Sequence, residues 1–315
     1  MASAGCPGSF PVAVDAYEVE NPEYVGAVVL DSARQRWIVR CPRTQEASVR
    51  LESEHVILHS FTPGCGLACP SSCPPSSARR TGTGCGRSCT RRSRVRWWTS
   101  RSWCAAPTWS SPEREPLSTQ LGKALATIHT LPIEIVREGD LPTYTAQRCR
   151  DRMLAELDRA AGTGKVPAPL LRRWESRLED PRLWRFRPTV IHGDLSEENL
   201  VLDGTRLAAV RGWHDMQVAD PAADFAWLMS CPDQDFADAI VEVYTVQLPH
   251  TPDPHLLRRA YLHAEFALAQ WLVRGTEQGD EATVSEAQAM LRTLERGPAR
   301  IRALDEPRDA DAPAD

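Results

Sequence analysis

Lysine is almost missing from this sequence, which has 37 basic side chains but only two lysines, Lys123 and Lys165. The net charge is −5 and the isoelectric point is near 6.0, so composition gives no general argument for nucleic-acid binding. No stretch reaches the roughly 18 apolar residues of a membrane-spanning helix. The N-terminus has neither the basic region nor the apolar run of a secretory signal. These absences predict a cytoplasmic protein, and its 315 residues are enough for two lobes.

The ten cysteines lack the spacing of a metal site. Six of them lie between Cys65 and Cys104, with no pair at CxxC spacing and no histidine at ligand distance in the sequence. Without an export signal, a disulfide framework is also disfavoured. We therefore expect neither a zinc site nor disulfide bonds in this stretch.

Carboxylates are missing from one long internal segment. Between His55 and Pro112 there is no Asp, Glu or Lys, whereas Cys, Ser, Arg, Pro and Trp accumulate without any helical or strand period. We interpret residues 64–112 as disordered and out of frame, because these residue types are typical of GC-rich DNA read in a shifted frame. The other interpretation is that these arginines and tryptophans bind single-stranded nucleic acid, which is disfavoured because no pattern orders the segment.

The rest of the chain predicts an α+β fold with two lobes. Strand patterns over 17–40 and a helix pattern over 45–61 indicate that residues 1–63 form a partial N-lobe. Residues 113–300 predict a larger, mainly helical C-lobe, and the acidic tail 301–315 is expected to be disordered. The expected C-lobe helices cover 117–130 with Ser118 or Thr119 as N-cap, 144–161, 168–178, 221–230, 235–246, 254–274 and 281–296.

The most informative motif is His192-Gly193-Asp194, followed by Asn199. It comes after the short apolar run Val190-Ile191 and before a predicted hairpin at Asp203-Gly204. In phosphoryl transfer, a carboxylate such as Asp194 takes the proton of the acceptor hydroxyl. An amide oxygen five residues later suits Mg²⁺, which prefers oxygen ligands. Gly193 permits a tight turn, and His192 is expected to brace the loop rather than act as a base.

These residues give the C-terminal half a resemblance to the aminoglycoside and macrolide phosphotransferases, a small-molecule branch of the protein-kinase-like fold. The similarity covers the loop from His192 to Asn199, Trp213, and the helix start from Asp220 to Ala226, and it is specific over about 190–230. The resemblance implies a kinase-like two-lobed fold with a degraded N-lobe. It also implies Mg²⁺ and ATP or GTP as co-substrate, with no nucleic-acid or membrane partner.

The N-lobe departs from the family pattern, and so does Arg211-Gly212-Trp213, which stands where the resemblance places a metal-binding triplet. Arg40 stands where the family usually has a phosphate-binding lysine, and Glu54 stands where its partner glutamate would lie. Gly212 occupies the position of the principal metal-binding aspartate of the family. The absence of that carboxylate is expected to lower the rate of phosphate transfer by about a thousandfold or more. Asp215 is the candidate substitute beside Asn199, and Gly212→Asp is expected to raise metal–nucleotide affinity.

Two functions remain open on the sequence. The first is transfer of the γ-phosphate of ATP or GTP to a hydroxyl of a small molecule, with aminoglycoside or macrolide antibiotics as the acceptors that the resemblance suggests. The alternative is a catalytically impaired, pseudokinase-like binding protein, which Gly212 and the anomalous segment favour. Asp194 is the predicted catalytic residue in the first case.

Overall fold

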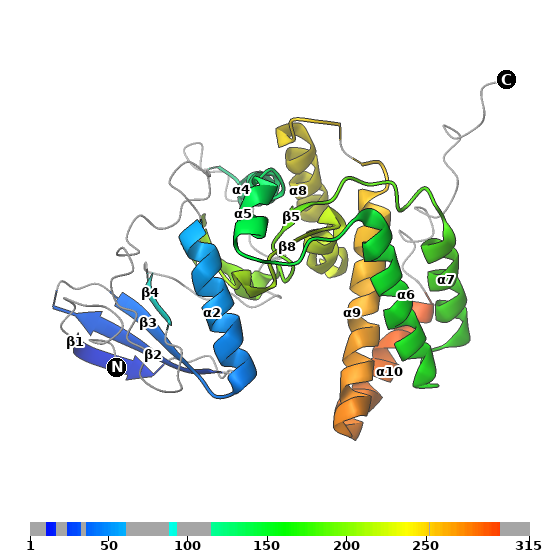
Figure 1. Cartoon of the computed structure of the whole chain (residues 1–315), viewed down its shortest axis with the longest axis horizontal. Helices are drawn as coiled ribbons and strands as arrows, with labels where there is room; N and C mark the ends of the chain where they lie inside the picture. The colour runs from blue at the N-terminus through cyan, green and yellow to red at the C-terminus, as the bar shows by residue number, and fades with distance from the viewer. Residues whose placement is uncertain are drawn as a thin grey trace.

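A computed structural model shows an α+β protein with a small sheet-bearing lobe and a larger helical lobe (Figure 1). The expected fold class is confirmed by this arrangement. The structure describes residues 11–16, 24–32, 36–60, 88–92, 115–251 and 253–296. The predicted tail 301–315 and most of the segment 64–112 lie outside these residues.

The N-lobe is a four-stranded antiparallel sheet with one helix. Its strands follow the order β1–β2–β3–β4. Their bounds are β1 Pro11–Ala16, β2 Tyr24–Asp31, β3 Arg36–Pro42 and β4 Ser88–Arg92. The register pairs Gly26 of β2 with Arg40 of β3, and Arg40 in turn with Ser88 of β4.

Strand β4 corrects one expectation from the sequence. Residues 64–112 were predicted to be disordered, but Ser88–Arg92 pairs with residues Arg36 to Arg40 of β3. The ladder relies on backbone N–H and C=O groups, which every non-proline residue carries, so the unusual composition of this stretch does not prevent pairing. Strand β1 also begins earlier than the predicted strand region 17–40.

Helix α2, Gln45–Ser60, carries the buried face of the N-lobe. Ala47, Leu51, Glu54 and Ile57 recur at three- and four-residue spacing and are all buried. Three of these residues are apolar, whereas Glu54 carries a carboxylate. Because a buried carboxylate is costly without a hydrogen bond, Glu54 needs a partner. The helix packs against β3 and against the short helix η2, Trp213–Asp215, of the other lobe.

Apart from α5, which was not predicted, the α-helices of the C-lobe lie close to their predicted positions. They are α4 Leu117–His129, α5 Ile133–Glu138, α6 Ala146–Gly162, α7 Ala168–Glu179, α8 Gln234–Gln247, α9 Leu256–Gln278 and α10 Glu281–Glu295. The predicted helix 221–230 is present as the 3₁₀ helix η3, Pro221–Ser230. The predicted N-cap at Ser118 or Thr119 is wrong, because α4 begins directly after Pro116, whose fixed φ suits a helix start without a side-chain cap.

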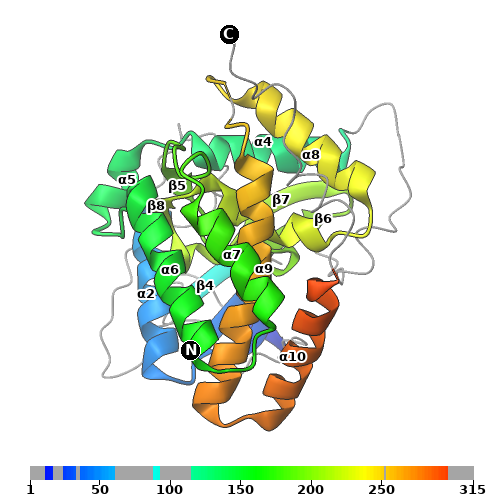
Figure 2. The same cartoon turned by 90° about the vertical axis from the view of Figure 1, so that its right-hand side faces the viewer.

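Helix α9 is the central helix of the C-lobe, in line with its apolar sequence. Leu262, Phe266 and Leu272 are buried in a cluster shared with α6, α7 and α10. These helices gather on one side of the lobe (Figure 2). A second cluster joins α4, α8 and η3, and it includes Leu195 and Leu200 of the segment that follows β5.

Two short β-ladders hold the loops of the candidate site. Strand β5, Thr189–Ile191, pairs with β8, Gln217–Ala219. Strand β6, Leu200–Asp203, pairs with β7, Arg206–Val210, to form the predicted hairpin. The His192 loop thus leaves β5, and the Gly212 loop connects β7 to β8. Among the described helices, none combines the length and apolarity needed to cross a bilayer.

Candidate functional site

His192 braces the loop that follows β5. Its side chain is fully buried, and its Nε2 lies 2.9 Å from the carbonyl oxygen of Arg211. Its Nδ1 accepts a hydrogen bond from the backbone N–H of Asp194 at 3.3 Å, which leaves Nε2 to donate to Arg211. The ring also packs against Trp213, with centroids 4.8 Å apart. His192 therefore connects the two loops of the site, as the sequence analysis expected, and it has no access to a substrate.

The carboxylate of Asp224 holds the same loop through hydrogen bonds to its backbone. One oxygen accepts the backbone N–H of His192 at 2.8 Å and the other accepts that of Gly193 at 2.9 Å. His129 Nε2 lies 3.1 Å from the first oxygen, and the His129 Nδ1 lies 2.9 Å from the hydroxyl of Tyr244. Asp224 and His129 are buried, so these bonds form in a medium where electrostatic interactions are strong.

Burial alone would raise the pKa of Asp224, but hydrogen bonding to His129 and the nearby His192 outweigh it and lower the pKa. Sequence reasoning identified Asp224 in its motif but missed His129 and Tyr244. His129 continues the apolar stripe of α4, where a lone histidine gives no separate signal. Tyr244 belongs to α8, far from the motif in sequence.

Gly193 brings the two loops into backbone contact. Its φ is +88°, a left-handed conformation that favours glycine. A Cβ at this position would overlap the carbonyl oxygen of Asp215. Only glycine therefore permits this approach, which places Asp215 beside the loop that carries Asp194.

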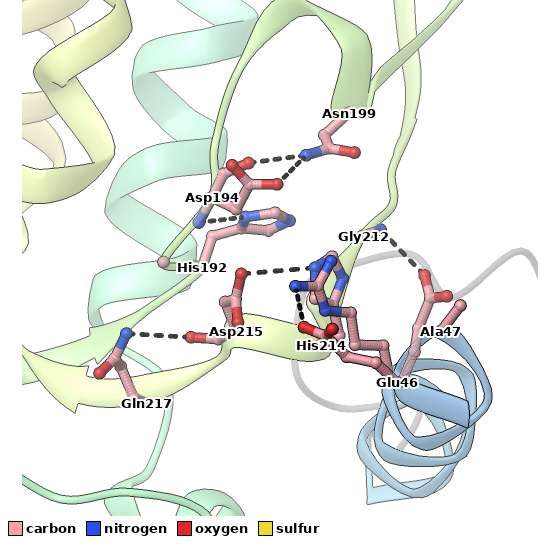
Figure 3. A network of polar contacts seen from close by, with 12 residues as sticks. Glu46, Ala47, His192, Asp194, Asn199, Gly212, His214, Asp215 and Gln217 are labelled. Carbon is pink, nitrogen blue, oxygen red and sulfur yellow. Dashed lines mark hydrogen bonds and ion pairs between the residues drawn. The ribbon is translucent and has the colours of Figure 1, made fainter. Parts of the chain in front are cut away.

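Asp194 and Asn199 also lie together, as their spacing predicted. The amide nitrogen of Asn199 donates to the Asp194 backbone carbonyl at 2.6 Å and to its carboxylate at 3.2 Å (Figure 3). The Asp194 carboxylate remains open to solvent on its other side. Partial removal from water raises the pKa of Asp194, and the negative charge of Asp215 raises it further. A carboxylate with a raised pKa is a better proton acceptor than an ordinary aspartate.

Gly212 has a backbone that suits glycine and a neighbour that fills its side-chain space. Its φ is +81°, and a Cβ would lie 2.5 Å from the amide oxygen of Asn199. Its N–H donates to a carboxylate oxygen of Glu54 at 2.9 Å. Glu54, which was predicted to bind the nucleotide, therefore contacts the backbone of Gly212. Arg40 is placed by its backbone in β3, and its side chain lies outside the described part of the structure.

Asp215 and His214 complete the site from the η2 side. The imidazole Nε2 of His214 lies 3.3 Å from the Asp215 carboxylate. One ligand atom each from Asp194, His214 and Asp215 lies within 4.8 Å of the others. Figure 3 shows Asp194 with Asn199 beside the turn that carries His214 and Asp215. The sequence analysis named Asp194, Asn199 and Asp215 but missed His214, although it directly precedes Asp215.

The start of η3 is held by a second buried charge system. Asp220 caps η3 by accepting the N–H of Ala222, and it pairs with Arg259 at 2.8 Å and with His263 at 3.2 Å. Burial would raise the pKa of Asp220, but the Arg259 guanidinium and His263 hold it well below the usual range. This system orients η3 and so the Asp224 carboxylate four residues further on.

Comparisons with known proteins identify the family of this chain. The model of the phosphotransferase enzyme family matches residues 26–258. An uncharacterized protein of Bacillus subtilis, YcbJ, is 30% identical over 94 residues, which is 30% of this chain and 28% of that protein. The chain thus matches well under two thirds of that relative's length.

Solved structures are similar over nearly the whole chain. A macrolide 2′-phosphotransferase type I has a TM-score of 0.72 at 20% identity, covering 92% of this chain and 94% of its own. A macrolide 2′-phosphotransferase of Brachybacterium faecium has a TM-score of 0.70 at 18% identity, with 89% and 91% covered. The GDP complex of aminoglycoside 2′-phosphotransferase-IIIa has a TM-score of 0.71 at 16% identity, with 94% and 96% covered.

Proposed function

Because the chain belongs to the phosphotransferase enzyme family, we propose that it transfers the γ-phosphate of ATP or GTP to a hydroxyl of a small molecule. The observation that carries this proposal is the placement of Asp194. Its carboxylate faces solvent at the end of a loop fixed by His192 and by the buried Asp224. Such a rigid, accessible carboxylate suits proton abstraction from a bound hydroxyl.

The reaction follows from this placement. The Asp194 carboxylate accepts the proton of the acceptor hydroxyl as its oxygen attacks the γ-phosphorus. A bond forms between that oxygen and phosphorus, while the bond from phosphorus to the β,γ-bridging oxygen breaks, and the nucleoside diphosphate leaves with that oxygen. The hydrogen bond from Asn199 keeps the carboxylate oriented toward the acceptor. The protein supplies mainly position and electrostatic stabilisation.

Mg²⁺ fits this site through oxygen donors, and we propose Asn199 and Asp215 as its ligands. Asp215 offers an exposed carboxylate, which the close contact of Gly193 with the Asp215 backbone places beside Asp194. Asn199 offers an amide oxygen in the space beside Gly212. The ion would neutralise the charge of the nucleotide phosphates. Asp215 thereby replaces the carboxylate that Gly212 lacks.

We propose that Arg40 and Glu54 both serve nucleotide binding, but in separate roles and without forming an ion pair with each other. Arg40 pairs with Gly26 in the β2–β3 ladder, and we propose that its cation binds the nucleotide phosphates in place of the family's lysine. Glu54 binds the N–H of Gly212 and so ties helix α2 to the loop that carries Asp215. Glu54 would then position the metal loop rather than touch the nucleotide.

Macrolide and aminoglycoside acceptors are the substrate classes that we propose first. The similarity to solved macrolide and aminoglycoside phosphotransferases supports both classes. The alternative of a pseudokinase-like binding protein is favoured by one observation, the glycine at position 212. It predicts nucleotide binding without phosphate transfer.

One experiment tests the proposal against its alternative. Binding of Mg·ATP and Mg·GTP is measured by calorimetry, and phosphate transfer from labelled nucleotide is followed with a panel of macrolides and aminoglycosides. Transfer that is lost in Asp194→Asn, with nucleotide binding retained, supports the kinase. Binding without transfer to any member of the panel supports the pseudokinase-like alternative.

A further inference from the structure

His214 gives this site a nitrogen donor that the expected Mg²⁺ ligands lack. Its side chain is one-fifth exposed and its Nε2 lies 3.3 Å from the Asp215 carboxylate. Together with Asp194, these residues place one nitrogen and two carboxylate oxygens within 4.8 Å of one another. The three donors come from two different loops, so folding rather than sequence proximity brings them together.

Residue 212 cannot contribute a side-chain ligand to a metal ion, because there is no room for a side chain there. The Asn199 amide oxygen fills the space where a side chain at residue 212 would begin, and the Asn199 nitrogen is engaged by Asp194. Side chains therefore converge on the other side of Asp194, where Asp215 and His214 lie. Both side chains therefore lie within reach of an ion that contacts the Asp194 carboxylate.

The dimensions and charges of the triad suit a divalent cation. With bonds of about 2.1 Å, opposite ligands of an octahedral ion are about 4.2 Å apart, so small side-chain rotations close the present separations. Two carboxylates balance the charge of the ion, and the ion relieves the repulsion between them. Mg²⁺ favours oxygen donors and loses its water reluctantly, whereas imidazole is a common ligand of first-row transition metals.

We propose that Asp194, His214 and Asp215 form a site for a divalent transition metal ion that binds without nucleotide. Mn²⁺ is the probe of choice, because the ten cysteines of the chain would compete for softer ions such as Zn²⁺. The inference does not depend on phosphate transfer, because binding is measured without nucleotide or acceptor. A failed transfer assay and a failed Mn²⁺ assay are therefore separate results.

The test is a titration of the full-length protein with Mn²⁺, followed by electron paramagnetic resonance of free and bound ion. Pulsed measurements on the bound ion detect a directly coordinated imidazole nitrogen. We expect bound Mn²⁺ with a nitrogen signal in the wild type, and we expect His214→Gln to remove that signal. Affinity for Mn²⁺ should fall about tenfold or more in this variant, since even outer partners of a metal site cost 10- to 100-fold.

His250→Gln is the matched control, because His250 is an exposed histidine on the connection after α8. It should leave both the signal and the affinity unchanged. Asp215→Asn is the second variant, and it should weaken Mn²⁺ binding while the protein stays folded by circular dichroism. No nucleotide-free Mn²⁺ binding, a nitrogen signal that survives His214→Gln, or equal losses in His250→Gln would each overturn the proposal.

Discussion

The amide oxygen of Asn199 lies 2.5 Å from the point where a Cβ on Gly212 would be. The two residues thus share one space, and a side chain at 212 requires Asn199 to move. The family resemblance suggested that Gly212→Asp restores a metal ligand and raises metal–nucleotide affinity. The structure leads us to expect the opposite.

We predict that Gly212→Asp lowers stability and does not improve metal binding. A non-glycine residue at a φ of +81° costs about 1–2 kcal/mol, and displacement of Asn199 adds to that cost. Gly164→Asp is a matched control, because Gly164 has a φ of +66° with no neighbour within 4 Å of an added Cβ. Urea unfolding of both variants separates the backbone cost from the contact with Asn199. Tighter Mg·ATP binding by Gly212→Asp would contradict this account.

Asp194→Asn should lower phosphate transfer by about 100- to 10,000-fold, because it removes the proton acceptor. Nucleotide affinity should change little, since this carboxylate serves the acceptor hydroxyl. Asp158→Asn, at an exposed position of α6, is the control for loss of one negative charge. Steady-state rates and calorimetric nucleotide titration provide the comparison. Unchanged turnover in Asp194→Asn would remove Asp194 from the mechanism.

Asp224→Asn should destabilise the protein and loosen the catalytic loop. An amide has one acceptor end, so it cannot serve both His192 and Gly193 as the carboxylate does. We expect a loss of about 2–4 kcal/mol, because a buried donor is left unsatisfied and the bond to His129 weakens. Asp233→Asn changes a carboxylate that only caps α8 at Phe236 and should cost about 1 kcal/mol at most. Comparable losses in the two variants would show that Asp224 is an ordinary cap.

The Asp220–Arg259 pair predicts how stability depends on pH. The pKa of Asp220 is lowered in the folded state, so its contribution is complete above the unfolded value of about 3.9. That contribution is lost as pH falls toward the folded value. Asp220→Asn should cost up to about 3–5 kcal/mol at pH 7, because the buried Arg259 loses one of its two carboxylate partners and keeps only Asp253.

The difference between the wild type and Asp220→Asn should shrink as pH falls below about 4. Denaturant unfolding at several pH values measures it. A difference that stays constant between pH 7 and pH 3 would show that the charge of Asp220 is not the source of its contribution.

Sequence reasoning placed Asp194 beside Asn199 because the contact between them is local. Asp194 and Asn199 are five residues apart, and their hydrogen bond follows from that spacing. The C-lobe helices other than the short α5 were predicted for a similar reason, since their apolar residues recur within each segment. The family and the two-lobed fold were also inferred correctly from these local signals.

The missed features depend on contacts between distant residues. The hydrogen bond from Gly212 to Glu54 joins the two lobes, and no periodicity in either segment encodes it. His129 and Tyr244 meet only after α4 and α8 pack together. Strand β4 was missed because its pairing with β3 is made by backbone groups, and its composition conceals it.

The long separation of these contacts has a consequence for the newly synthesised chain. Glu54 and Gly212 are 158 residues apart, and His129 and Tyr244 are 115 apart. The ribosome must therefore release residue 244 before the catalytic loop can acquire all of its supports. Contacts of such high sequence separation slow folding. An incomplete chain exposes apolar surface until the later helices are synthesised and can pack against it. A product ending before α8 would retain the His192–Asn199 motif, yet it would lack the tyrosine that holds His129 against Asp224.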